Sequence, residues 1–203
     1  MEQLRYTLLA DGSSDKVLIP IINWAIRERL PDCRVASQFA DPLGAVGLAL
    51  ADRLPVALKL FPCDLLFVHR DAEGAPARQR LREIAEAMRH FDQCYVPIVP
   101  VRMTEAWLLS SPRAIRRAAG NENGASNLGL PVRRHWEGRP NPKDDLEKAL
   151  KAASGKAYRR RGREDFPRQR LLVAEYTEDF SALRGLSSFD FFESQLVEKL
   201  KDL

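Results

Sequence analysis

Residues 64–71, DLLFVHRD, decide the fold because they form a nearly uninterrupted apolar run that ends at charged residues. Consecutive apolar positions without alternation are typical of a strand buried on both faces of a parallel sheet. The run is also far too short to cross a membrane. It predicts a central strand whose carboxyl end leads directly to Asp71.

The segments on either side of this strand alternate between strand and helix patterns. Further strands are expected at 6–10, 33–39 and 94–101, and helices at 15–30, 45–60 and 76–91. A tight turn joins the first strand to the first helix, with Ser13 or Ser14 as the N-cap and Asp15 in the first turn. Strands and helices that alternate in this way predict a parallel sheet covered on both faces.

The pattern changes after Val101 to short helices and loops. Helices are expected at 104–111, 112–120, 143–153, 167–184 and 188–202, and a Gly/Asn-rich loop at 121–129. We expect this half to pack on the sheet and frame a site. The predicted fold is α/β, with a Rossmann-like parallel sheet of about four strands in residues 1–103. A mainly helical extension follows in residues 104–203, within the same structural unit.

Composition indicates a globular protein and not a membrane protein. The chain has 203 residues, of which 45% are apolar and 30% charged. Its first residues lack the apolar segment of a secretory signal, so we expect a cytoplasmic protein. Cys33, Cys63 and Cys94 are widely spaced and odd in number, which argues against both a disulfide framework and a zinc site. We interpret all three as small core residues.

Basic residues are concentrated in the second half of the chain. The net charge is only +4, but residues 158–163 read YRRRGR. Such a run attracts phosphate backbones and predicts that Arg159, Arg160 and Arg161 contact nucleic acid. The alternative is that the run is only a solvated surface.

Acidic residues follow three of the expected strands. Asp11 closes the first strand, Asp71 and Glu73 close the third, and Glu105 follows the fourth. Ligands of parallel α/β sheets bind beyond the carboxyl ends of the strands. If the first and third strands are neighbours, the acids converge, and several like charges in one cleft require a cation between them. Oxygen ligands indicate Mg²⁺ or Mn²⁺.

Each acid also has a purely structural interpretation. These are an Asp11–Gly12 turn, a first-turn acid at Asp15, a turn through Gly74 after Glu73, and a helix at Glu105 capped by Thr104. The pair Asp71 and Glu73 is the strongest signal, because alternation in an extended chain would place both side chains on the same side.

Two residues near the acids have competing interpretations. His69 precedes the acid pair and is either a metal ligand or, more in keeping with a buried strand, a hydrogen-bonded core histidine. Trp107 is either a platform for base stacking or a core residue, and the core is favoured.

Four segments together resemble the Toprim domain shared by topoisomerases, primases and OLD-type nucleases. They are LLADGSSDKVLIP at 8–20, FVHRDAEG at 67–74, PVRMTEAWLLSSP at 100–112 and NPKDDLEKAL at 141–150. The likeness covers most of the chain. It is greatest to an uncharacterised bacterial Toprim-like branch that is associated with defence against phage.

The resemblance implies one or two metal ions, surrounded by a set of five acids: Asp11, Asp15, Asp71, Glu73 and Glu105. Of these acids, all but Asp15 would also be catalytic. It further implies that Lys143 and Arg102 neutralise the scissile phosphate. The chain departs from the family pattern at three positions, with aspartate at 11 and 15 where glutamate is usual, and glutamate at 73 where aspartate is usual.

The favoured hypothesis is a metal-dependent nuclease that cleaves DNA or RNA as the effector subunit of a defence or DNA-processing system. The sequence has no G-x-x-x-x-G-K-[ST] motif, so an ATPase of the AAA or ABC type would be a separate partner chain. A homo-oligomer is compatible with the sequence. The alternatives are an inactive Toprim-like module that binds a partner or nucleic acid, and a phosphotransfer receiver or small-molecule α/β enzyme.

Overall fold

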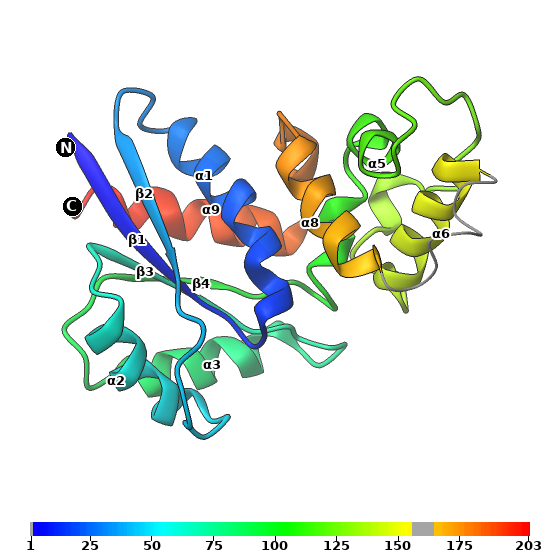
Figure 1. The fold of residues 1–203 in the computed structure, drawn as a ribbon. Coiled ribbons are helices and arrows are strands. Elements are labelled where there is room, and N and C mark those ends of the chain that lie inside the picture. Colours follow the sequence, from blue (N-terminus) through cyan, green and yellow to red (C-terminus); the bar gives the residue numbers. More distant parts are fainter. Residues whose placement is uncertain (1, 156–164) are drawn as a thin grey trace.

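The computed structural model describes residues 2–155 and 165–203 and is built around a four-stranded parallel sheet (Figure 1). Its strands are β1 (Gln3–Leu9), β2 (Arg34–Phe39), β3 (Leu65–His69) and β4 (Tyr95–Ile98), in the order β2-β1-β3-β4. The predicted α/β fold is therefore confirmed. The two central strands, β1 and β3, are neighbours, so their carboxyl ends lie side by side.

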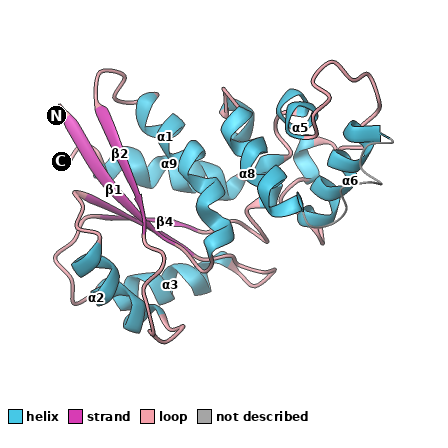
Figure 2. Cartoon of the chain, viewed as in Figure 1, coloured by secondary structure: helices cyan, strands magenta, loops and turns pink. Residues whose placement is uncertain are grey.

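Helices cover both faces of the sheet (Figure 2). One face packs against α1 (Leu18–Arg27) and α9 (Ser187–Lys199), and the other against α2 (Leu50–Leu60) and α3 (Ala77–Met88). Strand β3 alternates between these layers. Leu65 and Phe67 join the core on the α1 and α9 side, whereas Leu66 and Val68 join the core on the α2 and α3 side. Both faces of β3 are thus buried, as its uninterrupted apolar run predicts.

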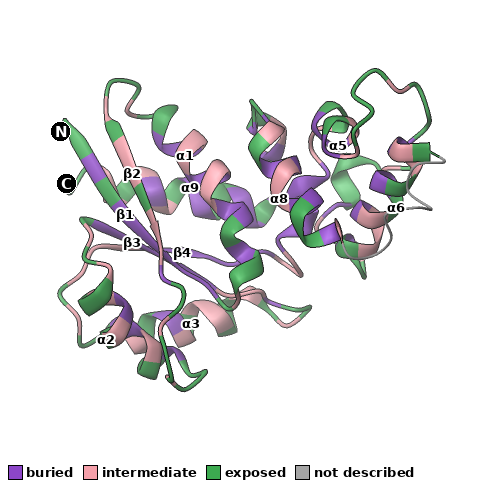
Figure 3. Cartoon of the chain, viewed as in Figure 1, coloured by how far each residue is buried: buried purple, intermediate pink, exposed green. Residues whose placement is uncertain are grey.

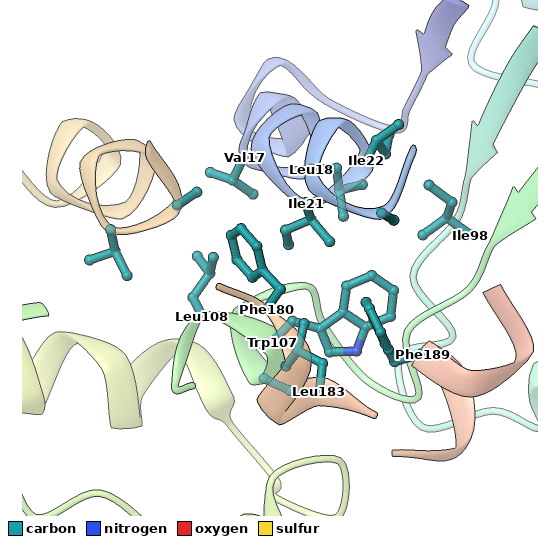
Figure 4. Close-up of a cluster of buried hydrophobic side chains, with 14 of the residues drawn as sticks. Val17, Leu18, Ile21, Ile22, Ile98, Trp107, Leu108, Phe180, Leu183 and Phe189 are labelled. Carbon is teal, nitrogen blue, oxygen red and sulfur yellow. The ribbon is translucent and has the colours of Figure 1, made fainter. Parts of the chain in front are cut away.

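Trp107 lies at the centre of the larger core, where β4, α1, α9 and the short helix α4 (Glu105–Leu108) meet (Figure 4). Its side chain is fully buried, and its ring packs edge-on against Phe189 at 5.3 Å between centroids. Its indole N–H donates to Ser188 Oγ at 3.2 Å. The core interpretation of Trp107 is confirmed. Truncating so large a buried ring to alanine costs about 3–5 kcal/mol.

The helical extension shares this core with the sheet. Besides α4 it contains α5 (Pro112–Ala118), α6 (Pro142–Ser154) and α8 (Phe166–Tyr176). Two of these helices begin at sequence-encoded caps: Ser111 Oγ and Asn141 Oδ1 each accept a backbone N–H three residues later, and proline follows each cap. The buried inner faces of these helices (Figure 3) and the apolar side chains on the α1 and α9 side of the sheet form one continuous cluster.

Several predicted helix boundaries are wrong. The first helix begins as a 3₁₀ turn, η1 (Ser13–Val17), and its N-cap is Gly12 instead of Ser13 or Ser14. The second begins at Leu50 and not at Ala45, and its N-cap, Ala49, has extended backbone.

The helix expected at 167–184 ends at Tyr176. The Thr177 hydroxyl donates to the carbonyl of Val173 at 2.7 Å, and the chain turns to extended backbone at Thr177. A separate 3₁₀ turn, η5 (Ser181–Leu183), follows. Side-chain to backbone bonds of this kind compete with helix continuation, which the apolar spacing does not reveal. Within residues 2–155 and 165–203, no helix is both long enough and apolar enough to cross a membrane.

Candidate site at the carboxyl edge of the sheet

Three of the predicted acids gather at the carboxyl ends of the neighbouring strands β1 and β3. Asp11 lies two residues beyond β1, Asp15 lies in the η1 turn that follows, and Asp71 lies two residues beyond β3. The convergence expected of Asp11 and Asp71 therefore depends on the observed strand order. This edge, where the two central strands are joined to helices on opposite faces, is where ligands of parallel sheets bind.

His69, the last residue of β3, lies between two of these acids. Its side chain is fully buried, and its Nε2 lies 3.1 Å from Asp71 Oδ1. On the other side of the ring, Nδ1 lies 3.6 Å from Asp15 Oδ2, an ion-pair distance longer than a hydrogen bond. The hydroxyl of Thr104 is 3.2 Å from Nε2. The expectation of a hydrogen-bonded core histidine is confirmed.

The two acids keep His69 protonated. Burial lowers the pKa of the imidazole, but the bonds and charges of Asp15 and Asp71 outweigh burial and raise that pKa from 6.5 to about 9. Both ring nitrogens therefore carry protons at neutral pH, and Thr104 Oγ1 accepts from Nε2 together with Asp71. His69 is therefore a buried cation that the protein itself supplies to these acids.

Asp15 is fixed by the turn in which it lies. Its Oδ2 accepts the Gly12 backbone N–H at 3.0 Å, and its own N–H donates to the Gly12 carbonyl at 3.1 Å. Burial alone would raise the pKa of Asp15, but His69, the Gly12 N–H and Arg170 together hold that pKa below its usual range. Asp15 therefore keeps its negative charge to lower pH than an ordinary aspartate and pairs with His69.

Asp11 differs from Asp15 in its exposure and in the direction of its pKa shift. Its carboxylate is 39% exposed and forms an ion pair with Arg70 at 3.0 Å. Burial is the main factor that raises the pKa of Asp11, and the charges of Asp15 and Asp71 raise it further against the opposing effect of Arg70 and His69. The raised pKa therefore reflects mainly the cost of holding a charged carboxylate in a partly buried place, which Arg70 and His69 offset only in part.

Arginines balance much of the remaining charge at this edge. Arg70 also pairs with Glu83 at 3.1 Å, and Arg80 pairs with Glu83 at 3.0 Å. Arg80 donates from Nε to the backbone carbonyl of Asp71 at 3.2 Å. The sequence argument that converging acids require a metal ion is therefore incomplete, because the folded chain supplies cations of its own.

Glu73 does not share the orientation of Asp71. Strand β3 ends at His69, so the alternation expected of the acid pair does not extend to residue 73. Glu73 has a φ of 53° and Gly74 a φ of 88°, which turns the chain away from the strand. The Glu73 carboxylate is 69% exposed and lies 3.6 Å from Arg80.

Arg102 supports this turn from the β4 side. Its backbone carbonyl accepts the Glu73 N–H at 3.1 Å. Its guanidinium packs so closely on Gly74 that a Cβ there would lie 3.0 Å from Nη1. The positive φ of Gly74 favours glycine at this position, and any larger side chain would also have to displace the Arg102 guanidinium slightly. Arg102 thus lies beside the turn that carries Asp71 and Glu73, and its contact with phosphate stays a prediction.

Glu105 is engaged elsewhere. Its side chain is 5% exposed and forms a buried ion pair with Arg170 of α8. Arg170 also donates to the backbone carbonyl of Ser14 in η1. This contact joins α4, α8 and η1, three segments distant in the sequence. The structure thus places Glu105 in a buried ion pair, and the arginine of that pair also acts on the η1 turn that carries Asp15.

The remaining predicted cations lie away from these acids or cannot be located. Lys143 is exposed in the first turn of α6. In the parts of the chain that the structure describes, no hydrogen bond or ion pair joins Lys143 to the sheet edge. Residues 159–161, the predicted nucleic-acid contacts, lie outside the described ranges. The roles of these four residues stay predictions.

The acids that remain open fit a small hard cation better than an enclosing metal cage. Across residues 2–155 and 165–203, no cluster of three or more His, Cys, Asp or Glu side chains has the geometry to hold a metal ion. Asp11 and Asp71 are, however, partly exposed and close enough to interact electrostatically. Mg²⁺ keeps several waters and is usually bound by one or two carboxylates plus substrate phosphates. The donor set Asp11 and Asp71 meets that requirement.

Sequence reasoning missed Arg70 and Arg170. Arg70 lies between His69 and Asp71, and its position next to a predicted strand end is a signal that was available in the sequence. Arg170 lies 65 residues from its partner Glu105, and a mid-helix arginine in the extension carries no comparable signal. Only the tertiary fold reveals this pair.

Comparisons with known proteins identify no relative. No model of a protein family matches the chain, and neither do any curated proteins or solved structures.

Proposed function

We propose that the protein is a divalent-metal-dependent phosphodiesterase that cleaves DNA or RNA at the carboxyl edge of its sheet. The observation that carries the proposal is the pair Asp11 and Asp71, two partly exposed carboxylates at adjacent ends of the central strands. Next to burial, neighbouring negative charge is what raises the pKa of Asp11, and a bound cation relieves such repulsion.

Asp11 and Asp71 hold the ion in this proposal, and their surroundings keep them in place. A bound Mg²⁺ or Mn²⁺ supplies charge stabilisation to a phosphoryl oxygen and lowers the pKa of a coordinated water. Arg70 orients the Asp11 carboxylate through their ion pair, and His69 holds one oxygen of Asp71. The other Asp71 oxygen is left for the ion.

Arg102 is the cation best placed to meet substrate. Its guanidinium lies against Gly74 in the turn that carries Asp71. Arginine binds phosphate through paired N–H donors, so a backbone phosphate bound beside the turn would be recognised by shape and charge. The basic run at 158–163 adds attraction that is independent of nucleotide sequence.

The test is cleavage of labelled single-stranded DNA, duplex DNA and RNA by purified protein with Mn²⁺ or Mg²⁺. We expect activity that a chelator abolishes and that Asp71→Asn reduces by at least about a hundredfold, because that change removes a charged ligand while keeping the side-chain shape. Asp32→Asn is the matched control, since Asp32 is an exposed acid that precedes β2 at the opposite edge of the sheet.

Two results would contradict the proposal. One is the absence of metal-dependent cleavage of all three substrates by folded protein. The other is cleavage that Asp71→Asn leaves at the level of Asp32→Asn, which would assign the activity to a contaminant or to another part of the chain.

A second candidate, a binding module without catalysis, is favoured by the internal compensation of charge. His69, Arg70 and Arg80 already pair with acids of this edge. Nucleic-acid binding that weakens with salt, in protein that binds no Mn²⁺ at about millimolar concentration, would identify this function.

We place either activity in the cytoplasm, in a defence or DNA-processing system with a separate AAA- or ABC-type ATPase. Two things support this placement: the resemblance of four sequence segments to Toprim-like proteins and the absence of a phosphate-binding loop motif in the sequence. Copurification of the chain with an ATPase encoded beside it would test the partnership, and an ATPase that neither binds the chain nor alters its activity would contradict it.

A further inference from the structure

His69 lies between two of the acids at the sheet edge but is itself closed to solvent. Its side chain has no exposure to solvent, and the Asp15 and Asp71 carboxylates lie at its two ring nitrogens, at 3.6 Å and 3.1 Å. The acids come from different strand ends. Asp15 belongs to the η1 turn after β1, and Asp71 to the turn after β3.

Both acids lie in turns that are fixed by hydrogen bonds of the backbone. Asp15 Oδ2 accepts the Gly12 N–H at 3.0 Å, next to Asp11. In the turn after Asp71, Ala72 N–H donates to the Pro100 carbonyl and Glu73 N–H to the Arg102 carbonyl, both at 3.1 Å. The ring of His69 therefore bridges two turns that present the open acids Asp11 and Asp71.

We propose that His69 is a positioning residue that fixes the spacing of Asp11 and Asp71 by holding the η1 turn through Nδ1 and the Asp71 carboxylate through Nε2. This inference rests on the proposed metal site, which it deepens. Groups that orient metal ligands typically contribute tenfold to a hundredfold to metal affinity. His69 acts through the acids and does not itself touch substrate.

Two substitutions separate the two ends of the ring. The amide nitrogen of glutamine reaches the position of Nε2, and that of asparagine reaches the position of Nδ1. His69→Gln therefore keeps the donor to Asp71 and loses the one toward Asp15, whereas His69→Asn does the reverse. His90→Gln is the control, because His90 is an exposed histidine at the end of α3.

The experiment combines amide hydrogen exchange without metal and calorimetry with Mn²⁺. We expect His69→Gln to speed exchange of the Gly12 amide, and His69→Asn to speed exchange of the Ala72 and Glu73 amides. The effect of His69→Asn should be roughly tenfold, as expected for loss of about one hydrogen bond. The effect of His69→Gln should be smaller, because the contact from Nδ1 to Asp15, at 3.6 Å, is an ion pair and not a hydrogen bond. Mn²⁺ affinity should fall about 10–100-fold in His69→Asn and less than about tenfold in His69→Gln. His90→Gln should change neither.

The exchange pattern decides the inference even if the metal site is absent. Faster exchange of a different turn in each variant would support the positioning role of His69. Equally faster exchange of both turns in both variants would overturn that role and indicate only lost packing. Failure of the wild-type protein to bind Mn²⁺ would overturn the proposed function and leave the exchange result to judge His69. Wild-type binding with unchanged exchange and affinity in both variants would overturn the role of His69 alone.

Discussion

The α4–α8 junction and the carboxyl edge of the sheet each contain a buried cation beside a carboxylate, but they differ in what they leave open. At the junction, Arg170 and Glu105 are 7% and 5% exposed, so the pair is closed on itself. At the sheet edge, His69 is fully buried while its partner Asp71 is 24% exposed. The difference teaches that an acid after a strand can bind a ligand only if the side chain paired with it leaves one carboxylate oxygen free.

The largest effect is expected from breaking the closed pair. Arg170→Met leaves Glu105 buried without its cation, so the free energy of unfolding should fall by about 3–5 kcal/mol in urea titrations. The double variant Arg170→Met with Glu105→Leu should regain most of this loss, because it removes both charges. A single variant as stable as the wild type would show that the junction is not a buried ion pair.

At the sheet edge, we expect the stability of the protein to depend on pH through the charge of His69. The pKa of His69 is about 9 in the folded protein, above its ordinary value of 6.5. The protonated His69 therefore contributes on the order of 3 kcal/mol to the free energy of unfolding. This contribution is fully present below about pH 6.5 and is lost as the pH rises through about 9. Wild-type protein should lose more stability than His69→Gln between about pH 6 and pH 10 in parallel urea titrations. Equal losses in the two proteins would contradict the raised pKa.

A smaller effect is expected at Thr104, which links the two regions. Its hydroxyl contacts His69 Nε2 at 3.2 Å, and the next residue, Glu105, belongs to the junction. Thr104→Val should cost about 1 kcal/mol of unfolding free energy, since Nε2 retains its bond to Asp71. Thr104→Ser, which keeps the hydroxyl, should lose less, as thermal melts would show. If serine proves as costly as valine, the methyl group and not the bond is what matters.

The smallest effect concerns Glu73, the exposed acid outside the open pair. Its φ of 53° is costly for any residue with a Cβ and easy for glycine. Glu73→Gly should therefore exceed Glu73→Ala in unfolding free energy by up to about 1 kcal/mol, measured in urea. An alanine variant more stable than the glycine variant would contradict the turn geometry at this position.

The sequence predicts the layered fold better than it predicts the site. The uninterrupted run at residues 65–68 and the alternation of strand and helix patterns are local signals, and the structure confirms the parallel sheet they indicate. The placement of Asp11 near Asp71 follows from strand order, which the sequence left open. Gly74 is a local signal for the turn after Glu73, and the structure confirms that turn. The favoured interpretation, in which the alternation of the strand continues to Glu73, is wrong because β3 ends at His69.

The partners of the acids were the least predictable part. Glu105 follows β4 as Asp71 follows β3, yet Arg170 from α8 encloses it. The pairing of residues so far apart depends on how the extension packs, and apolar spacing carries no information on that contact. Residue type and strand position together therefore name candidate ligands, but exposure and ion-pair partners select among them.

The most direct test of the central claim is Mn²⁺ calorimetry on the wild type, Asp11→Asn, Asp71→Asn and Glu73→Gly. We predict that wild-type protein binds Mn²⁺, that each aspartate substitution weakens binding by at least about tenfold, and that Glu73→Gly leaves the affinity within about threefold. The claim that Asp11 and Asp71 bind a metal ion would be contradicted if the wild type bound no Mn²⁺, or if both aspartate variants bound it as tightly as the wild type.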